Sequence, residues 1–179
     1  MINAIAKSNS ASKAAEAESV LNRMLKSYEG GNQDAKPNTR TYSTILNACA
    51  YTNGDQTDRA AAFKIARKAF KEILSGDHGE PNQIMFATFM LACKHLVPYG
   101  VKRDQLVQFV FKECCQHGLV DIKVILNLRR VLSPSNLNEA LQGTPLSNGM
   151  IELTDIPLDW RRSLQNREVP KQFHRGVKK

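Results

Sequence analysis

The chain has 179 residues, which is long enough for one domain with a hydrophobic core of ordinary size. Its apolar fraction of 42% and charged fraction of 23% are typical of a globular protein, and no stretch holds the roughly 18 consecutive apolar residues of a membrane-spanning helix, so a membrane span is excluded. The formal net charge is +8, and residues 157–179 contribute +5 of it. This excess favours a polyanionic partner, although a solvated basic tail is the commoner meaning of such a count.

The first predicted helix pair lies at the start of the chain. Apolar residues recur at helical spacing between Ala17 and Tyr28 and predict one helix. Before it, residues 1–6 match residues 45–50, as if the chain began inside an earlier copy of that segment. We therefore expect the first turns of the first helix of this pair, which contains residues 1–6, to be missing and the natural N-terminus, with any targeting signal, to lie upstream. For the same reason the Ser- and Ala-rich opening is not interpreted as a transit peptide.

Two helices are predicted next. Apolar residues at Tyr42, Ile45, Leu46 and Cys49 follow the i, i+3, i+4, i+7 pattern of one helix face. After a polar break, the segment 63–74 restores the same period and predicts a second helix. Gly76 and Gly79 end it, and Pro81 prevents its continuation because proline lacks the backbone N–H.

The following segment repeats the previous one. Residues 42–49 read Tyr-Ser-Thr-Ile-Leu-Asn-Ala-Cys and residues 86–93 read Phe-Ala-Thr-Phe-Met-Leu-Ala-Cys, with an offset of 44 residues, and a Pro-Asn pair precedes both. A break at Pro98 and Gly100 separates the second copy from another helical stripe at 106–114. A fixed period in this range predicts stacked repeats that bury their apolar faces against one another, so we expect an extended binding surface.

The end of the chain is less regular. After Asp121, apolar residues at 124–132 predict a helix that stops at Ser133-Pro134, and a weaker helix is predicted from Asn136 to Leu141. Trp160 is interpreted as a lid over the last helix pair. We expect about the last fifteen residues to be poorly ordered, because they are highly charged and terminal.

Paired helices with Thr-Tyr-Ser-Thr-Ile-Leu-Asn-Ala in the first and a Lys-Pro-Asn or Glu-Pro-Asn junction resemble the pentatricopeptide repeat family over roughly residues 1–132. The sequence of these units is similar to that of algal family members and of the repeat region of proteinaceous RNase P, but the nuclease domain of that enzyme is absent. The resemblance implies an all-α fold, a right-handed α-solenoid of antiparallel helix pairs. Its parts are a repeat domain at 1–142, divided into units 1–38 (truncated), 39–82, 83–121 and 122–142 (partial), and a C-terminal extension at 143–179 with a basic, flexible tail.

Repeats of that family usually run to about 35 residues, so the spacing of 44 implies surplus length in the turns, which we place at 53–58 and 75–80. Family members bind single-stranded RNA along the first helices, one nucleotide per unit. The fifth residue of a unit and the last residue before the next unit read the base, and the second residue packs against it. The resemblance thereby implies RNA-binding roles for Asn38, Arg40, Ser43, Asn82, Ile84, Ala87, Asp121 and Lys123.

Only the central unit matches this pattern well. The Ser43 hydroxyl and the Asn82 amide are able to hydrogen-bond a base edge, in a pairing that tends to favour adenine in the family, whereas Ala87 in the next unit has no such group. The resemblance implies a single-stranded RNA-binding protein of organellar RNA metabolism, in processing, stability or translation, located in a mitochondrion or chloroplast. It implies no enzymatic activity.

Other interpretations stand beside this one. Asn38, Asn82 and Asp121 each precede a predicted helix, where capping alone explains them. Cys49 and Cys93 are expected to be small core residues, and the histidines lack an acidic partner at useful spacing, so we expect no catalytic residue, metal, cofactor or small-molecule substrate. The alternative function is a protein-interaction scaffold of the tetratricopeptide type, although the Trp and Leu-Gly signature of those repeats is absent; protein partners on the outer helices remain compatible with either function.

Overall fold

The structure of the protein is a computed structural model that describes residues 2–8, 10, 12–142, 144 and 151–164. Every regular element in these residues is a helix, which confirms the predicted all-α class. The α-helices are α1 (Ile2–Lys7), α2 (Lys13–Glu29), α3 (Thr39–Ala50), α4 (Gln56–Leu74), α5 (Gln83–Leu96), α6 (Val101–Gln116), α7 (Ile122–Val131), α8 (Pro134–Ala140) and α9 (Leu158–Arg161), with short 3-10 helices at Gln33–Ala35 and Leu153–Asp155. None of these helices combines the length and apolar character needed to cross a bilayer.

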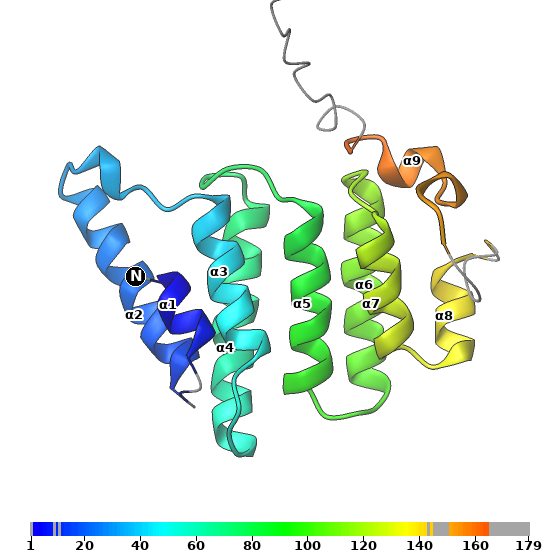
Figure 1. Ribbon diagram of the computed structural model, residues 1–179, viewed down its shortest axis with the longest axis horizontal. Helices are drawn as coiled ribbons and strands as arrows, with labels where there is room; N and C mark the ends of the chain where they lie inside the picture. Colours follow the sequence, from blue (N-terminus) through cyan, green and yellow to red (C-terminus); the bar gives the residue numbers. More distant parts are fainter. Residues whose placement is uncertain (1, 9, 11, 143, 145–150, 165–179) are drawn as a thin grey trace, which may run out of the picture.

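The helices are arranged in two rows (Figure 1). The front row consists of α1, α3, α5 and α7, which pack against one another in that order and face the viewer. The back row consists of α2, α4 and α6, each of which packs against the front-row helix that precedes it and the one that follows it. Each of the segments 39–82 and 83–121 therefore supplies one helix to the front row and one to the back row.

Three front-row helices begin in the same way. Asn38, Asn82 and Asp121 have extended backbones, and the side-chain oxygen of each accepts a hydrogen bond from the N–H three residues further on, at 3.1, 3.0 and 2.8 Å. Such a cap contributes about 0.5–2 kcal/mol, because it satisfies an N–H group that has no partner within the helix. The expected capping role of these residues is confirmed.

The centre of the core is a group of aromatic rings between α4 and α5. Phe70 stacks on Phe89 with ring centroids 4.2 Å apart and an angle of 3° between the rings, and Phe86 meets Phe70 edge-on at 5.5 Å. Cys49 and Cys93 are completely buried beside them in the same core, as predicted. The apolar positions repeated in the two octamers therefore point inward.

The two segments expected to hold surplus length differ from each other. Residues 56–58 do not belong to a turn, because Asp55 accepts hydrogen bonds from Thr57 and Asp58 N–H and starts α4 at Gln56. Residues 75–80 do connect α4 to α5. Gly79 has a φ of +105° there, and a Cβ on it would lie 2.7 Å from the Thr39 hydroxyl oxygen, so this connection needs glycine at that position.

The segment 151–164 packs against the end of α6. The Trp160 ring meets Phe111 of α6 edge-on at 5.4 Å, and the Trp160 carbonyl accepts a hydrogen bond from Val120 N–H at 2.8 Å, so Trp160 lies over the end of α6. The predicted helix at 136–141 is α8, capped by Ser133. The tail that we expected to be poorly ordered, 165–179, lies outside the described residues.

Candidate nucleic-acid interface

Three front-row helices, α3, α5 and α7, each present a stripe of half-exposed and exposed side chains. Residues three or four positions apart lie on one face of a helix, and the half-exposed or exposed ones between the buried positions define one surface. We call this surface the front face; it comprises Arg40, Ser43 and Asn47 on α3, Ile84, Thr88 and Leu91 on α5, and Lys123, Leu126 and Arg130 on α7.

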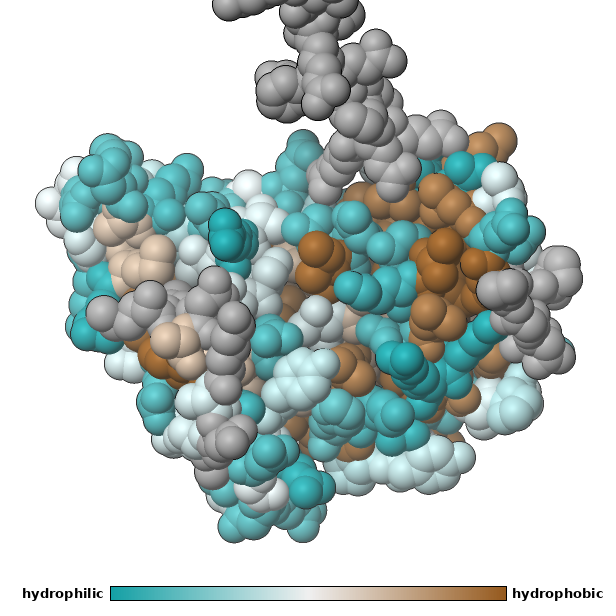
Figure 2. Space-filling model, viewed as in Figure 1, coloured by the Kyte–Doolittle hydropathy of each residue, from teal (hydrophilic) through white to brown (hydrophobic). Residues whose placement is uncertain are grey.

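The charge of the two rows differs. The helical segments α1, α3, α5 and α7 contain no aspartate or glutamate, whereas α2, α4 and α6 all carry both signs of charge. The front-row basic residues with described side chains are Arg40, Lys94, Lys123, Arg129 and Arg130. Figure 2 shows the corresponding face as mostly hydrophilic, with apolar patches over α5 and α7. A surface with one sign of charge attracts anions over its whole length.

The packing positions of the sequence analysis lie on this face. The second residue of each of these helices is exposed: Arg40 on α3, Ile84 on α5 and Lys123 on α7. Each lies two positions after the residue that caps its helix. Ile84 is 51% exposed, which is a large fraction for an isoleucine, and Leu126 on the neighbouring helix is 39% exposed. These two apolar side chains interrupt the row of cations.

The fifth positions differ from one another. The Ser43 hydroxyl donates a hydrogen bond to the Thr39 carbonyl at 2.8 Å, although it remains half-exposed. Ala87 is only 2% exposed, because α7 packs over it and the Asn127 amide donates a hydrogen bond to its carbonyl at 2.8 Å. The structure therefore argues against Ala87 as a contact residue: its side chain has no accessible surface to offer.

Sequence reasoning missed three residues of the front row. Asn127 is buried and joins α5 to α7, while Arg130 and Lys94 are exposed cations one or two turns beyond the predicted positions. The Arg130 guanidinium lies 3.4 Å from the Asn127 side-chain oxygen. The repeat register itself held the signal, because Arg130 follows Lys123 by seven residues and so lies on the same helix face.

The cysteines do not form a reactive site. Burial raises the pKa of the Cys49 and Cys93 thiols to about 12, and it raises the pKa of Cys114 well above its ordinary value. Neutral thiols are poor nucleophiles and poor metal ligands. Within the described ranges, no three His, Cys, Asp or Glu residues gather closely enough to hold a metal ion.

Thiol labelling checks this burial. At pH 8, we expect iodoacetamide to modify Cys49 and Cys93 roughly a thousand times more slowly in the native protein than in urea, because the thiolate fraction falls with the raised pKa. Mass spectrometry of digested samples assigns the label to each cysteine, and the urea sample is the control. Equal rates in both states would mean that the core opens readily.

Comparison of the chain with protein-family models, with characterised proteins and with solved structures found no match.

Proposed function

We propose that the protein is a pentatricopeptide-like α-solenoid that binds single-stranded RNA along its front face, without catalytic activity of its own. By the family resemblance, its place would be organellar RNA metabolism. The observation that carries the proposal is the absence of acidic residues from the front-row helices. A chain of phosphates meets no carboxylate on these helices, whereas on the back-row helices carboxylates lie among the cations.

The cations of the front face suit an extended polyanion. Arg40, Lys123 and Arg130 are exposed, and they lie on helices that are not sequence neighbours, with α5 between α3 and α7. A small anion would need them to converge on one point, but a nucleic-acid backbone requires cations spread along its path. The spread of these cations from α3 to α7 therefore favours a strand of RNA over a compact ligand.

The uncharged residues of the face suit bases. Ile84 and Leu126 expose apolar surface beside these cations, against which a base is able to pack. Ser43 and Asn82 supply a hydroxyl and an amide near the starts of α3 and α5. Because both groups already serve the backbone of their own helices, we propose that any base reading uses their remaining hydrogen-bonding capacity, namely the Ser43 oxygen and the Asn82 NH2 group.

A protein-interaction scaffold is the second candidate, and one observation favours it. Val101 and Phe109 on the back-row helix α6 are 72% and 56% exposed, and Tyr99 just before the helix is 76% exposed. Exposed apolar side chains of this size are enriched at protein interfaces. This surface lies on another row from the front face, so the two functions are compatible.

The deciding experiment measures RNA affinity across a salt series. Fluorescence anisotropy with a labelled single-stranded RNA is recorded for the wild-type chain and for the triple variant Arg40→Gln, Lys123→Gln, Arg130→Gln. We expect the variant to bind at least about tenfold more weakly at low salt, and its slope of log K against log salt to be shallower by about 2, since each lost phosphate contact contributes roughly 0.7.

The matched control removes the same charge from the back row through Lys64→Gln, Arg67→Gln and Lys71→Gln, all exposed residues of α4. The basic C-terminal tail is present in all three proteins, so it contributes equally. Equal losses in both triple variants would show binding by net charge alone, and undetectable binding by the wild-type protein would refute the RNA proposal. Helicity measured by circular dichroism should be unchanged throughout.

A further inference from the structure

A second candidate site lies at the opposite end of α5 from its capping Asn82. A cavity of about 620 Å³ opens there between the α3–α4 turn, the last turn of α5 and the α5–α6 turn. Its volume is within the roughly 300–1,000 Å³ of sites that hold small organic ligands. The polar side chains that line it include Asp55, Arg59, Lys94, His95, Tyr99 and Arg103.

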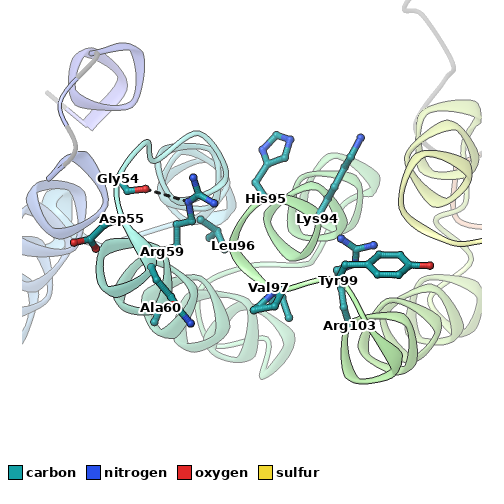
Figure 3. A pocket seen from close by; sticks show the side chains of 12 residues that line it. Gly54, Asp55, Arg59, Ala60, Lys94, His95, Leu96, Val97, Tyr99 and Arg103 are labelled. Atoms are coloured by element: carbon teal, nitrogen blue, oxygen red, sulfur yellow. Dashed lines mark hydrogen bonds between the residues drawn. The ribbon is translucent and has the colours of Figure 1, made fainter.

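Three nitrogen-bearing side chains extend toward the same side of this cavity. Figure 3 shows Arg59, Lys94 and His95 pointing in one direction from α4 and α5. The Arg59 Nε–H donates to the Gly54 carbonyl at 3.1 Å, which fixes the guanidinium and leaves its two terminal amino groups for a ligand. The His95 Nδ1 lies 2.7 Å from the Ala50 carbonyl oxygen, so Nδ1 carries a proton and Nε2 faces away from that bond.

The one carboxylate of the lining is occupied elsewhere. Asp55 accepts hydrogen bonds from Thr57 and Asp58 N–H at 2.8 and 2.9 Å, and in Figure 3 its carboxylate points away from His95 and Lys94. The N-terminus of α4 therefore neutralises much of its charge. The net character of the cavity is cationic.

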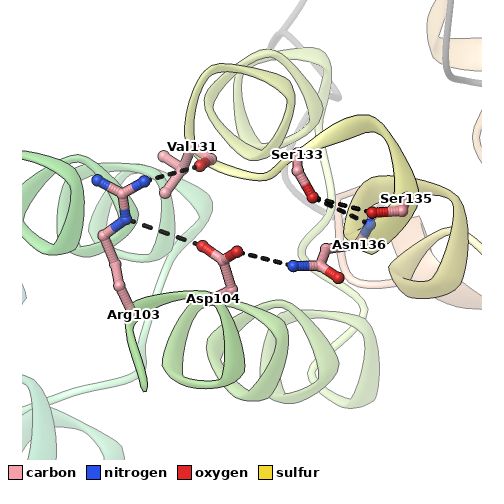
Figure 4. Close-up of polar contacts among 6 residues, drawn as sticks. All are labelled: Arg103, Asp104, Val131, Ser133, Ser135 and Asn136. Carbon is pink, nitrogen blue, oxygen red and sulfur yellow. Dashed lines mark hydrogen bonds and ion pairs between the residues drawn. The ribbon is translucent and has the colours of Figure 1, made fainter. Parts of the chain in front are cut away.

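Arg103 forms a fixed part of the wall. It is only 9% exposed, its guanidinium lies 4.7 Å from the centre of the Tyr99 ring, and one of its terminal amino groups donates to the Val131 carbonyl at 3.4 Å (Figure 4). Its Nε lies 3.8 Å from an Asp104 oxygen and has no hydrogen-bond acceptor within range. Arg103 is therefore held in the cavity wall by Asp104, Tyr99 and the Val131 carbonyl.

Tyr99 supplies a flat surface beside these cations. Its side chain is 76% exposed, and Arg103 covers one face of the ring. A guanidinium on one face of an aromatic ring leaves the opposite face for another planar group, which is the arrangement that nucleobases use on protein aromatic side chains.

We infer that this cavity binds a nucleoside phosphate, with the phosphate among Arg59, Lys94 and His95 and the base on Tyr99. A simple phosphate would not need the exposed tyrosine, and an apolar ligand would not need the cations. The source of the ligand is either a free mononucleotide or the terminal nucleotide of an RNA, which share this chemistry. The inference does not depend on RNA binding by the front face, because it concerns another group of residues and a ligand of one nucleotide.

Calorimetric titration of the full chain tests the inference. Adenosine monophosphate, ribose 5-phosphate and adenosine are the probes, and we expect the monophosphate to bind most tightly. Arg59→Gln should weaken its binding about tenfold or more, because a charge-assisted hydrogen bond is lost. Tyr99→Ser should weaken the monophosphate about tenfold through lost stacking but leave ribose 5-phosphate almost unaffected. Both residues are exposed, and exposed Lys102→Gln on α6 is the matched control.

A second arm separates the two sources. The same RNA is compared with a 5′-monophosphate and with a 5′-hydroxyl: tighter binding of the phosphorylated form, lost in Arg59→Gln, assigns the cavity to an RNA end, whereas mononucleotide binding without this difference assigns it to a free nucleotide. The inference would be overturned if the protein showed no mononucleotide binding and no 5′-phosphate effect. It would also be overturned if Arg59→Gln left the binding unchanged. The front-face triple variant retains the cavity, so failure of the RNA proposal is seen independently.

Discussion

Replacing Phe89 by alanine is expected to lower the free energy of unfolding by about 3–5 kcal/mol. Phe89 is 2% exposed and lies on α5, where its ring stacks on Phe70 at 4.2 Å and faces Phe63 at 6.3 Å. Removing the ring deletes its two stacking contacts with α4 and leaves a cavity that the neighbouring rings, held by two helices, are poorly able to fill. Urea unfolding followed by circular dichroism measures the change.

The matched control is Phe109→Ala on α6, because Phe109 is 56% exposed. The same chemical change there should cost well under about 1 kcal/mol, since most of that ring is already in water. Similar losses of unfolding free energy in the two variants would contradict the described core. A stabilising effect of Phe109→Ala would not contradict it, because removing exposed apolar surface from the folded protein can raise its stability.

Asp104→Ala is expected to destabilise the protein by about 3–5 kcal/mol, because it breaks a buried ion pair and leaves its cation unpaired. Asp104 is 6% exposed, its carboxylate faces Arg103, and it accepts a hydrogen bond from the Asn136 amide at 2.7 Å (Figure 4). The substitution therefore affects α6 and α8 together. Thermal unfolding and urea unfolding both measure the loss.

The double variant Arg103→Leu, Asp104→Leu separates charge from packing. Replacing both partners of a buried pair by apolar residues removes the unpaired charge, so we expect most of the lost stability to return. If the double variant is as unstable as Asp104→Ala, the destabilisation is not caused by the unpaired cation. It is then caused by the loss of the Asn136 hydrogen bond or of packing. Its nucleoside phosphate binding should be reduced as well, since Arg103 lines the cavity.

The helices of the two central repeats were predictable because their signals are local. The stripe from Tyr42 to Cys49 corresponds to α3, and the Asn38 cap fixes its first residue, so spacing and one side chain determine the element without distant contacts. The same reasoning identified the start of α5 at Asn82. The starts of α4 and α6 differed, because their apolar stripes begin only at residues 63 and 106, several residues inside the helices.

The docked segment after α8 was less predictable. Trp160 was expected over the last helix pair and instead lies over the end of α6, and the hydrogen bonds that hold residues 151–164 depend on tertiary geometry. A Cβ on Gly118 would lie 2.5 Å from the Arg162 side chain, which shows how closely this segment approaches the α6–α7 turn. No periodicity in the sequence encodes such a contact.

The candidate sites divide in the same way. The repeat register placed Arg40, Ile84 and Lys123 at equivalent exposed positions, but it gave no indication that α7 would cover Ala87. His95 had no partner at useful spacing in the sequence, and folding brings it to one cavity with Arg59 and Arg103. Sites formed by three separate turns become visible only once the chain is folded.

The two-row arrangement also implies that stability varies along the molecule. The main helix contacts join elements close together in the chain, so little loop entropy is lost as each forms, and such a chain folds quickly and opens in parts. α3 and α5 each pack extensively against four other helices, whereas α8 contacts only α6 and α7 among the principal contacts of the described helices. Local opening should therefore reach α3 and α5 last. The cavity lies against one of these two helices, whereas the front face extends from α3 to α7, which has fewer partners, so the two proposed ligands would meet surfaces of different rigidity.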